Sequence, residues 1–228
     1  MDSDFFNYIW LIFLLFIFIP IIQQRLLVRE RKKSLKKLEA QLESRVIVLI
    51  HRQELFALFG LPLFKFITME DSEQVLRAIH KTDPNTPIDL IVHTPGGLVL
   101  AATQIARALK KHPGKVRVII PHYAMSGGTL IALAADEIMM NENAVMGPVD
   151  PQIGGLPAAS ILRALERKPL SKVDDRNLIL ADVSTMAISQ LEKSVLSLCE
   201  GRLETEKAIE LSKKLTVSSP SLLILSLE

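Results

Sequence analysis

The sequence predicts an α/β domain built on a parallel β-sheet, preceded by an apolar helix at the N-terminus. Three short β-branched runs predict the sheet, since each is apolar and bounded by polar or turn residues, as buried parallel strands are: Val46–Ile50, Ile88–His93 and Val116–Ile120. Between the last two, Leu98–Lys111 carries apolar residues along one helical face. Strand, helix and strand in this order predict a βαβ unit.

The flanking segments continue the alternation of helix and strand. A helix is expected over Met69–His80, with Thr68 and Asp71 forming a capping box at its start. After the third strand we expect a helix at Gly127–Ala135, a strand at Glu137–Met140, a turn at Asn141–Asn143 and an extended segment at Ala144–Met146. The remaining periodic segments predict helices at Ala158–Arg167, Leu178–Leu198 and Thr205–Leu215.

The N-terminal run Phe5–Ile22 contains no charged residue. At about 1.5 Å per residue, a helix of this length nearly crosses a hydrocarbon core of about 30 Å. A buried core helix would show a polar face, and a cleaved signal peptide would begin with positive charge rather than with Asp2 and Asp4. We therefore expect residues 1–24 to be a retained single-pass anchor in the cell membrane, with the lipid bilayer as a partner.

Basic residues follow the apolar run and predict its orientation. Arg and Lys recur between Arg25 and Lys37, which places the residues after the span on the cytoplasmic side. Residues 25–44 are expected to form a basic stalk helix, which either touches anionic headgroups or is simply solvated. Nucleic acid is excluded as a partner, because the 228-residue chain has a net charge of only +2 and no second basic patch.

Two glycine-containing loops follow consecutive predicted strands. The first, His93–Gly97, reads HTPGG and leads into a helix; its glycines leave amides free to face an oxyanion, although a tight βα turn needs the same residues. The second contains Ser126 before Gly127 and Gly128, where the serine is either an exposed nucleophile or a helix cap. Both loops leave the carboxyl edge of the sheet and are expected to face each other.

Three motifs together carry a resemblance to a known family: HTPGG at His93–Gly97, AMSGG at Ala124–Gly128 and VMGPVDPQIGG at Val145–Gly155. They resemble the serine dehydrogenase proteinase family, which is related to signal peptide peptidase A and the Clp proteolytic subunit. The resemblance implies a crotonase/Clp-protease-like βαβ superhelix over residues 45–228. It also implies a nucleophile at Ser126, oxyanion-hole amides at Gly97 and Gly127, a third motif that helps to build the substrate channel or subunit contacts, and homo-oligomerisation.

A serine nucleophile needs a base, and its identity is left open by the sequence. The histidine of the Clp-type triad is absent, since no histidine follows His122. Signal peptide peptidase A uses a lysine instead, which predicts a Ser-Lys dyad of Ser126 with Lys172, or with Lys168. The alternatives are His122 and His93 as bases and several carboxylates as orienting groups: Asp150, Asp174, Asp175 and Asp182.

The function expected from these features is a membrane-anchored, ATP-independent serine endopeptidase acting on polypeptides. An acyl-CoA enzyme on the same fold and a non-catalytic membrane scaffold are the alternatives. No metal or cofactor is expected, since paired His/Cys ligands and a phosphate-binding loop are both lacking. The single cysteine, Cys199, is expected to be a packing residue, and Ser218–Glu228 reads as an abrupt end that predicts a truncated domain.

Overall fold

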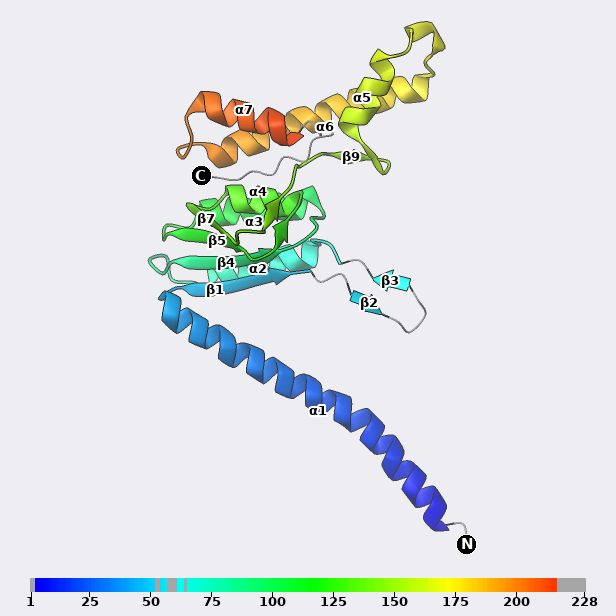
Figure 1. The fold of residues 1–228 in the computed structure, drawn as a ribbon, viewed down its shortest axis with the longest axis vertical. Helices are drawn as coiled ribbons and strands as arrows, with labels where there is room; N and C mark the ends of the chain where they lie inside the picture. The colour runs from blue at the N-terminus through cyan, green and yellow to red at the C-terminus, as the bar shows by residue number, and fades with distance from the viewer. Residues whose placement is uncertain (1–2, 52–53, 57–60, 64, 217–228) are drawn as a thin grey trace. The chain divides into compact units, whose positions relative to one another are not determined.

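The computed structural model describes residues 3–51, 54–56, 61–63 and 65–216 (Figure 1). The chain divides into two compact units, Met1–Val46 and Ile47–Glu228. The first unit consists of helix α1 (Ser3–Leu42) and the start of strand β1, and the second holds the rest of the sheet and the remaining helices. The C-terminal run Ser218–Glu228, expected to mark a truncation, lies outside the described residues.

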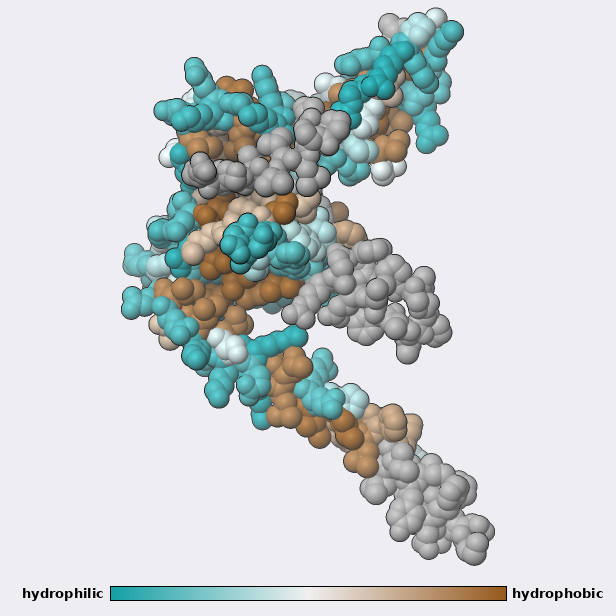
Figure 2. Space-filling model, in the orientation of Figure 1, coloured by the Kyte–Doolittle hydropathy of each residue, from teal (hydrophilic) through white to brown (hydrophobic). Residues whose placement is uncertain are grey.

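Helix α1 is continuous from the expected anchor into the expected stalk, with Pro20 inside it. Apolar side chains cover its described outer half, and Phe16 is 77% exposed (Figure 2). Across the described residues, no helix combines the length and the apolar character needed to cross a bilayer. The apolar stretch described without a gap, Phe13–Ile22, covers about 15 Å at the helical rise, and the side chains of residues 5–9, 11 and 12 lie outside the described set. The predicted helix is therefore confirmed, but the predicted membrane span is not supported.

The main sheet has the strand order β1-β4-β5-β7, formed by β1 (Arg45–Ile50), β4 (Ile88–His93), β5 (Val116–Ile120) and β7 (Glu137–Met140). Strands β4, β5 and β7 are parallel, and Leu90 of β4 is in register with Val118 of β5. The predicted strands are confirmed, as is the parallel pairing of β4, β5 and β7. Helix α3 (Val99–Lys110) lies between β4 and β5 in the chain, and helix α4 (Gly127–Leu133) lies between β5 and β7.

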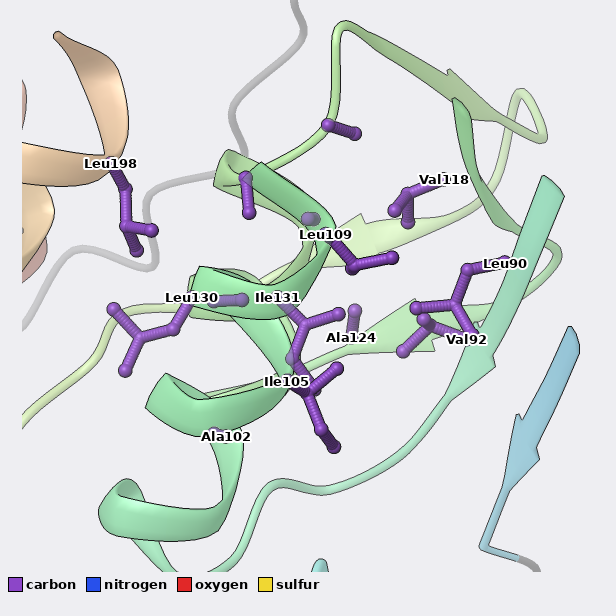
Figure 3. Close-up of a cluster of buried hydrophobic side chains, with 14 of the residues drawn as sticks. Leu90, Val92, Ala102, Ile105, Leu109, Val118, Ala124, Leu130, Ile131 and Leu198 are labelled. Carbon is purple, nitrogen blue, oxygen red and sulfur yellow. The ribbon is translucent and has the colours of Figure 1, made fainter. Parts of the chain in front are cut away.

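The core lies between this sheet and helices α3 and α4. Figure 3 shows Leu90 and Val92 of β4 and Val118 of β5 beside Ile105, Leu109 and Ile131 from the two helices. All of these side chains are fully buried. Burial of such aliphatic side chains contributes roughly 1.5–3 kcal/mol each relative to exposure, so this layer fixes the carboxyl edge of the sheet.

Local signals explain where the other helices begin. Helix α2 (Met69–His80) starts with the predicted capping box, in which Thr68 and Asp71 exchange side-chain to backbone hydrogen bonds. Helix α6 (Asp175–Cys199) begins three residues before the predicted Leu178, because the Asp174 side chain accepts a hydrogen bond from Asn177 N at 2.8 Å. Helices α5 (Ala158–Glu166) and α7 (Thr205–Thr216) and the short 3₁₀ turn Leu170–Lys172 complete the C-terminal part.

Three small strand pairs accompany the main sheet. Strands β6 (Tyr123–Ala124) and β8 (Val145–Met146) pair in parallel. Antiparallel pairs join β2 (Glu54–Phe56) to β3 (Leu61–Leu63) and β9 (Gln152–Ile153) to β10 (Leu156–Pro157). Of these, only the β8 segment was expected as an extended element, because runs of two or three residues carry too little periodicity to be predicted.

The end of α6 is fastened to the sheet layer by two cations. Lys110 Nζ of α3 donates to the carbonyl oxygens of Ser197 and Glu200. These carbonyl groups lie at the C-terminal end of α6, where no following turn of the helix supplies N–H donors. Arg202 then pairs with Asp136 at 2.8 Å. Between these contacts Cys199 is buried, as expected for a packing residue, and burial raises the pKa of its thiol.

An ion pair crosses the sheet on the register of β4 and β5. Asp89 and Arg117 lie opposite each other, and the guanidinium donates two hydrogen bonds to the carboxylate, at 2.5 and 2.8 Å. The Asp89 side chain is 2% exposed. Because Asp89 hydrogen-bonds it, Arg117 has a pKa above its ordinary value. The neighbouring pair of Lys115 and Glu137 is exposed.

Replacing Arg117 by Met is expected to destabilise the protein by about 3 kcal/mol, because the buried Asp89 carboxylate loses its bidentate partner. The measurement is the free energy of unfolding from a urea titration. Lys115→Met is the matched control, since it removes an exposed ion pair and should leave the unfolding midpoint unchanged. Equal effects of the two substitutions would contradict this account of the sheet.

Candidate functional site

The two glycine-containing loops meet beyond the carboxyl ends of β4 and β5. Thr94 forms an isolated parallel bridge with Ala124. Thr94 N donates to Tyr123 O at 3.1 Å, and Met125 N donates to Thr94 O at 3.0 Å. The ladder of the sheet thus continues into both loops, and the structure brings them together as the topology predicted.

Ser126 occupies the N-cap position of α4 in a strained backbone conformation, with φ 50° and ψ −114°. A non-glycine residue in such a region costs about 1–3 kcal/mol and is held there by its surroundings. Its side chain makes no capping hydrogen bond. The helix-cap interpretation of this serine is therefore wrong, and the half-buried hydroxyl is left for another use.

Gly96 and Gly97 lie against the serine and against the backbone that precedes α2. Gly96 has φ 106°, and a Cβ atom on it would lie 2.8 Å from Ser126 Cβ and 3.3 Å from Ser126 Oγ. A Cβ atom on Gly97 would lie 2.3 Å from Ile67 N. Both glycines are required by close approach, which the sequence motif alone could not distinguish from an ordinary turn.

The buried residue Ile67 holds the glycine loop from the outer side. Ile67 N donates to Gly96 O at 2.8 Å, and Leu98 N donates to Ile67 O at 2.9 Å. Because Gly96 C=O and Gly97 N–H belong to one peptide group, the first bond fixes the plane of the Gly97 amide, and the second fixes the next peptide group. Sequence reasoning missed Ile67, since a single apolar residue ahead of a capping box carries no recognisable signal.

The amides of Gly97 and Gly127 are close together beside the serine. A Cβ atom on Gly127 would lie 3.8 Å from Gly97 N. In the described part of the chain, neither amide has a hydrogen-bond acceptor, whereas Gly96 N and Gly128 N do. Two uncommitted N–H groups next to a hydroxyl can stabilise the negative charge that develops on a carbonyl oxygen under attack.

The third motif supports the serine loop. Thr129 Oγ1 donates towards Ala124 O and Gly147 O, at 3.0 and 2.6 Å, and Gly147 N donates to Ala124 O at 3.1 Å. The Met125 side chain lies so close over Gly147 that a Cβ atom there would be 2.3 Å from its Cε. The contacts of Gly147 are therefore with the serine loop itself.

The two candidate lysines lie away from this constellation. Lys172 is exposed in the 3₁₀ turn between α5 and α6, and no described hydrogen bond joins it to Ser126. Lys168 is also exposed and lines a pocket of about 310 Å³ between α5 and α6 that includes Ile161, Val173 and Leu180 but not Ser126. In Figure 1 the turn between α5 and α6 stands apart from α4.

The other candidate bases have different surroundings. His93, His122 and Tyr123 form a ring cluster, with centroids 5.6 Å apart between the histidines and 4.2 Å between His93 and Tyr123. Asp174 caps α6, and Asp150 accepts a hydrogen bond from Gln152. Asp175 and Asp182 are exposed. Within the described residues, no three His, Cys, Asp or Glu side chains cluster closely enough to hold a metal ion.

Known proteins resemble this chain over most of its length. MJ0137, an uncharacterized protein of Methanocaldococcus jannaschii, is 58% identical over 207 residues, which cover 91% of this chain and 72% of that protein. MJ1495, an uncharacterized protein of the same organism, is 57% identical over 216 residues, which cover 95% of this chain and 72% of that protein. The solved structure of ClpP1 from Listeria monocytogenes aligns with a TM-score of 0.52 at 15% identity, covering 82% of this chain and 87% of that one, which confirms the Clp-like α/β fold. Residues 1–220 match the model of ClpP-like SDH-type serine proteinases, so the resemblance is confirmed and the chain belongs to that family.

Proposed function

We propose that this protein is a serine endopeptidase in which Ser126 is the nucleophile and the Gly97 and Gly127 amides form the oxyanion hole. The observation that carries the proposal is the strained backbone of Ser126, whose hydroxyl makes no capping bond. Strain of this kind is retained at functional sites, where the surrounding structure over-determines it. The family membership supports the same chemistry.

The proposed reaction begins with attack of Ser126 Oγ on the carbonyl carbon of a peptide bond. The carbonyl oxygen gains negative charge and accepts hydrogen bonds from Gly97 N and Gly127 N, while the proton from Oγ passes to a base. That proton then reaches the leaving amine as the C–N bond breaks. Water hydrolyses the resulting acyl-enzyme and regenerates the serine. None of these steps consumes ATP, and we propose that the endopeptidase hydrolyses unfolded polypeptides without ATP.

For the base we propose Lys172, in a Ser-Lys dyad. A lysine accepts a proton only if desolvation keeps it neutral, and the Lys172 side chain is exposed in the isolated chain. The dyad therefore requires another surface to cover Lys172 and a rearrangement that brings it within hydrogen-bond reach of Ser126 Oγ, and we propose that a homo-oligomer supplies both. The oligomer also gives polypeptide substrates a site shielded from bulk water.

We further propose that α1 associates with a lipid bilayer at the cytoplasmic face of the cell membrane. Trp10, Phe16 and their apolar neighbours on α1 are exposed. The basic residues that follow, from Arg25 to Lys37, suit anionic headgroups. Substrates near the membrane surface are then the first to test.

Ser126→Ala is expected to abolish labelling by a fluorophosphonate probe and hydrolysis of an unfolded polypeptide without ATP. The loss follows because the nucleophilic oxygen is removed while the fold is kept, so the thermal midpoint should stay at the wild-type value. Equal labelling of the two proteins would overturn the proposed nucleophile. Tight binding of coenzyme A together with absent hydrolysis would favour an acyl-CoA enzyme instead.

Gly96→Ala is expected to slow fluorophosphonate labelling about 100-fold, because the added methyl group would displace Ser126 from its geometry. Gly201→Ala is the matched control. Gly201 also has a positive φ, 79°, but an added Cβ atom there would meet nothing within 4 Å. The two variants share the cost of the left-handed backbone, so a labelling defect in both would contradict the specific contact with Ser126.

Lys172→Met is expected to lower the labelling rate about 100-fold or more, as the loss of a general base does. Lys168→Met is the control, since this lysine lies in the same exposed segment and lines the pocket between α5 and α6. Both rates are measured at equal protein concentration, so that the oligomeric state is matched. A wild-type rate in Lys172→Met would show that another group takes the proton.

A further inference from the structure

A buried histidine outside the proposed reaction scheme lies next to the glycine loop. His51 follows strand β1 and is 6% exposed. Its Nδ1 is 2.9 Å from Thr94 Oγ1, and its Nε2 is 3.4 Å from Asp71 Oδ2. Its backbone N–H also donates to His93 O at 2.8 Å. Each polar atom of the imidazole thus has a partner inside the protein.

Thr94 contacts the His51 imidazole and also bonds to both loops of the site. Thr94 is fully buried, and its Oγ1 accepts a hydrogen bond from Gly96 N at 3.2 Å. Its backbone bonds to Tyr123 and Met125 of the serine loop. The hydroxyl that contacts His51 therefore belongs to the residue that joins the glycine loop to the serine loop.

Asp71 connects the other side of the imidazole to the segment that grips Gly97. Asp71 Oδ2 accepts hydrogen bonds from Thr68 N at 2.8 Å and from Thr68 Oγ1 at 2.7 Å. Thr68 directly follows Ile67, whose N–H and C=O bracket the Gly97 amide. The His51 ring thus lies between Thr94, which bonds to Gly96, and Asp71, which bonds to the residue after Ile67.

We propose that His51 is a positioning residue for the oxyanion hole, which orients the Gly97 amide through Thr94 on one side and Asp71 on the other. This inference rests on the proposed serine-protease function. Oxyanion stabilisation depends on the position and direction of the N–H groups, so a displacement of about 1 Å in the loop can slow the reaction about 100-fold. Among the described hydrogen bonds none joins His51 to Ser126, and both ring nitrogens already have partners, so we assign His51 a positioning role rather than that of the base.

Two amide substitutions separate the two bonds of the ring. Asn places its amide nitrogen or oxygen near the position of Nδ1, and Gln places it near Nε2. His51→Asn is therefore expected to keep the bond to Thr94, and His51→Gln to lose it. Fluorophosphonate labelling of Ser126 should slow about 10- to 100-fold in His51→Gln, which loses the bond to Thr94, and to a smaller extent in His51→Asn, which loses only the longer contact with Asp71 at 3.4 Å.

Thr94 provides a second, independent pair. Thr94→Val keeps the shape of the side chain but removes the hydroxyl, and it should slow labelling to the same extent as His51→Gln. Thr94→Ser keeps the hydroxyl and should label close to the wild-type rate. In every slow variant the decrease is expected in the maximal rate of inactivation, with the probe concentration for half-maximal rate unchanged, because the site still forms but is misaligned.

Wild type and Ser126→Ala are run alongside to separate the two levels of inference. If neither is labelled, or both are, the proposed function fails. If wild type is labelled at Ser126 but His51→Gln and Thr94→Val keep its rate, the positioning role fails alone. A purely structural role predicts the same labelling rate in all folded variants with a lowered thermal midpoint, and that result would also overturn the proposal.

Discussion

The contact on which the site depends is the close approach of the Gly97 backbone to Ile67, where even a single Cβ atom would meet Ile67 N at 2.3 Å. Ile67 N donates to Gly96 O and Ile67 O accepts from Leu98 N, and these two hydrogen bonds fix the peptide groups on both sides of the Gly97 Cα atom. The Gly97 N–H itself has no acceptor among the described residues. Ile67 is itself fixed because it is fully buried and because the capping box of α2 begins at the next residue. One helix start, one buried side chain and one glycine thus determine where the amide points.

Ser126, on the other side of the site, has a backbone conformation that is unfavourable by itself and costs about 1–3 kcal/mol. The bonds around it can offset that cost at about 1 kcal/mol each. Thr129 Oγ1 bonds to Ala124 O and Gly147 O beneath the loop, and Thr94 bonds to the residues on either side of Ala124. The strained serine is therefore held by contacts from β4 and from the third motif, which explains why the three motifs occur together.

Much of this arrangement follows from local sequence. The β-branched runs predicted β4 and β5, the Thr68–Asp71 pair predicted the start of α2, and the parallel order of the strands predicted that the two loops face each other. The grip of Ile67 on Gly97 and the contact of His51 with Thr94 could not be predicted in the same way. They join residues about 30 and 43 positions apart, and neither Ile67 nor His51 stands in a pattern that identifies its partner. The sequence also cannot identify which lysine acts as the general base, because that role depends on desolvation of the amine rather than on its spacing from the serine.

The proposed site is thus divided between parts of the fold that are held very differently. The proposed nucleophile and oxyanion amides lie in loops that follow consecutive parallel strands and share one buried layer, so a single chain can preorganise them. Lys172 comes from the turn between α5 and α6, and the described hydrogen bonds that tie α6 to the sheet layer are at its far end, near Ser197 and Glu200. Nothing within the described chain desolvates that lysine, whereas Ser126 is already half-buried. We propose that assembly covers the exposed Lys172 amine and thereby completes the proton-accepting half of the site, which folding of the single chain leaves in solvent.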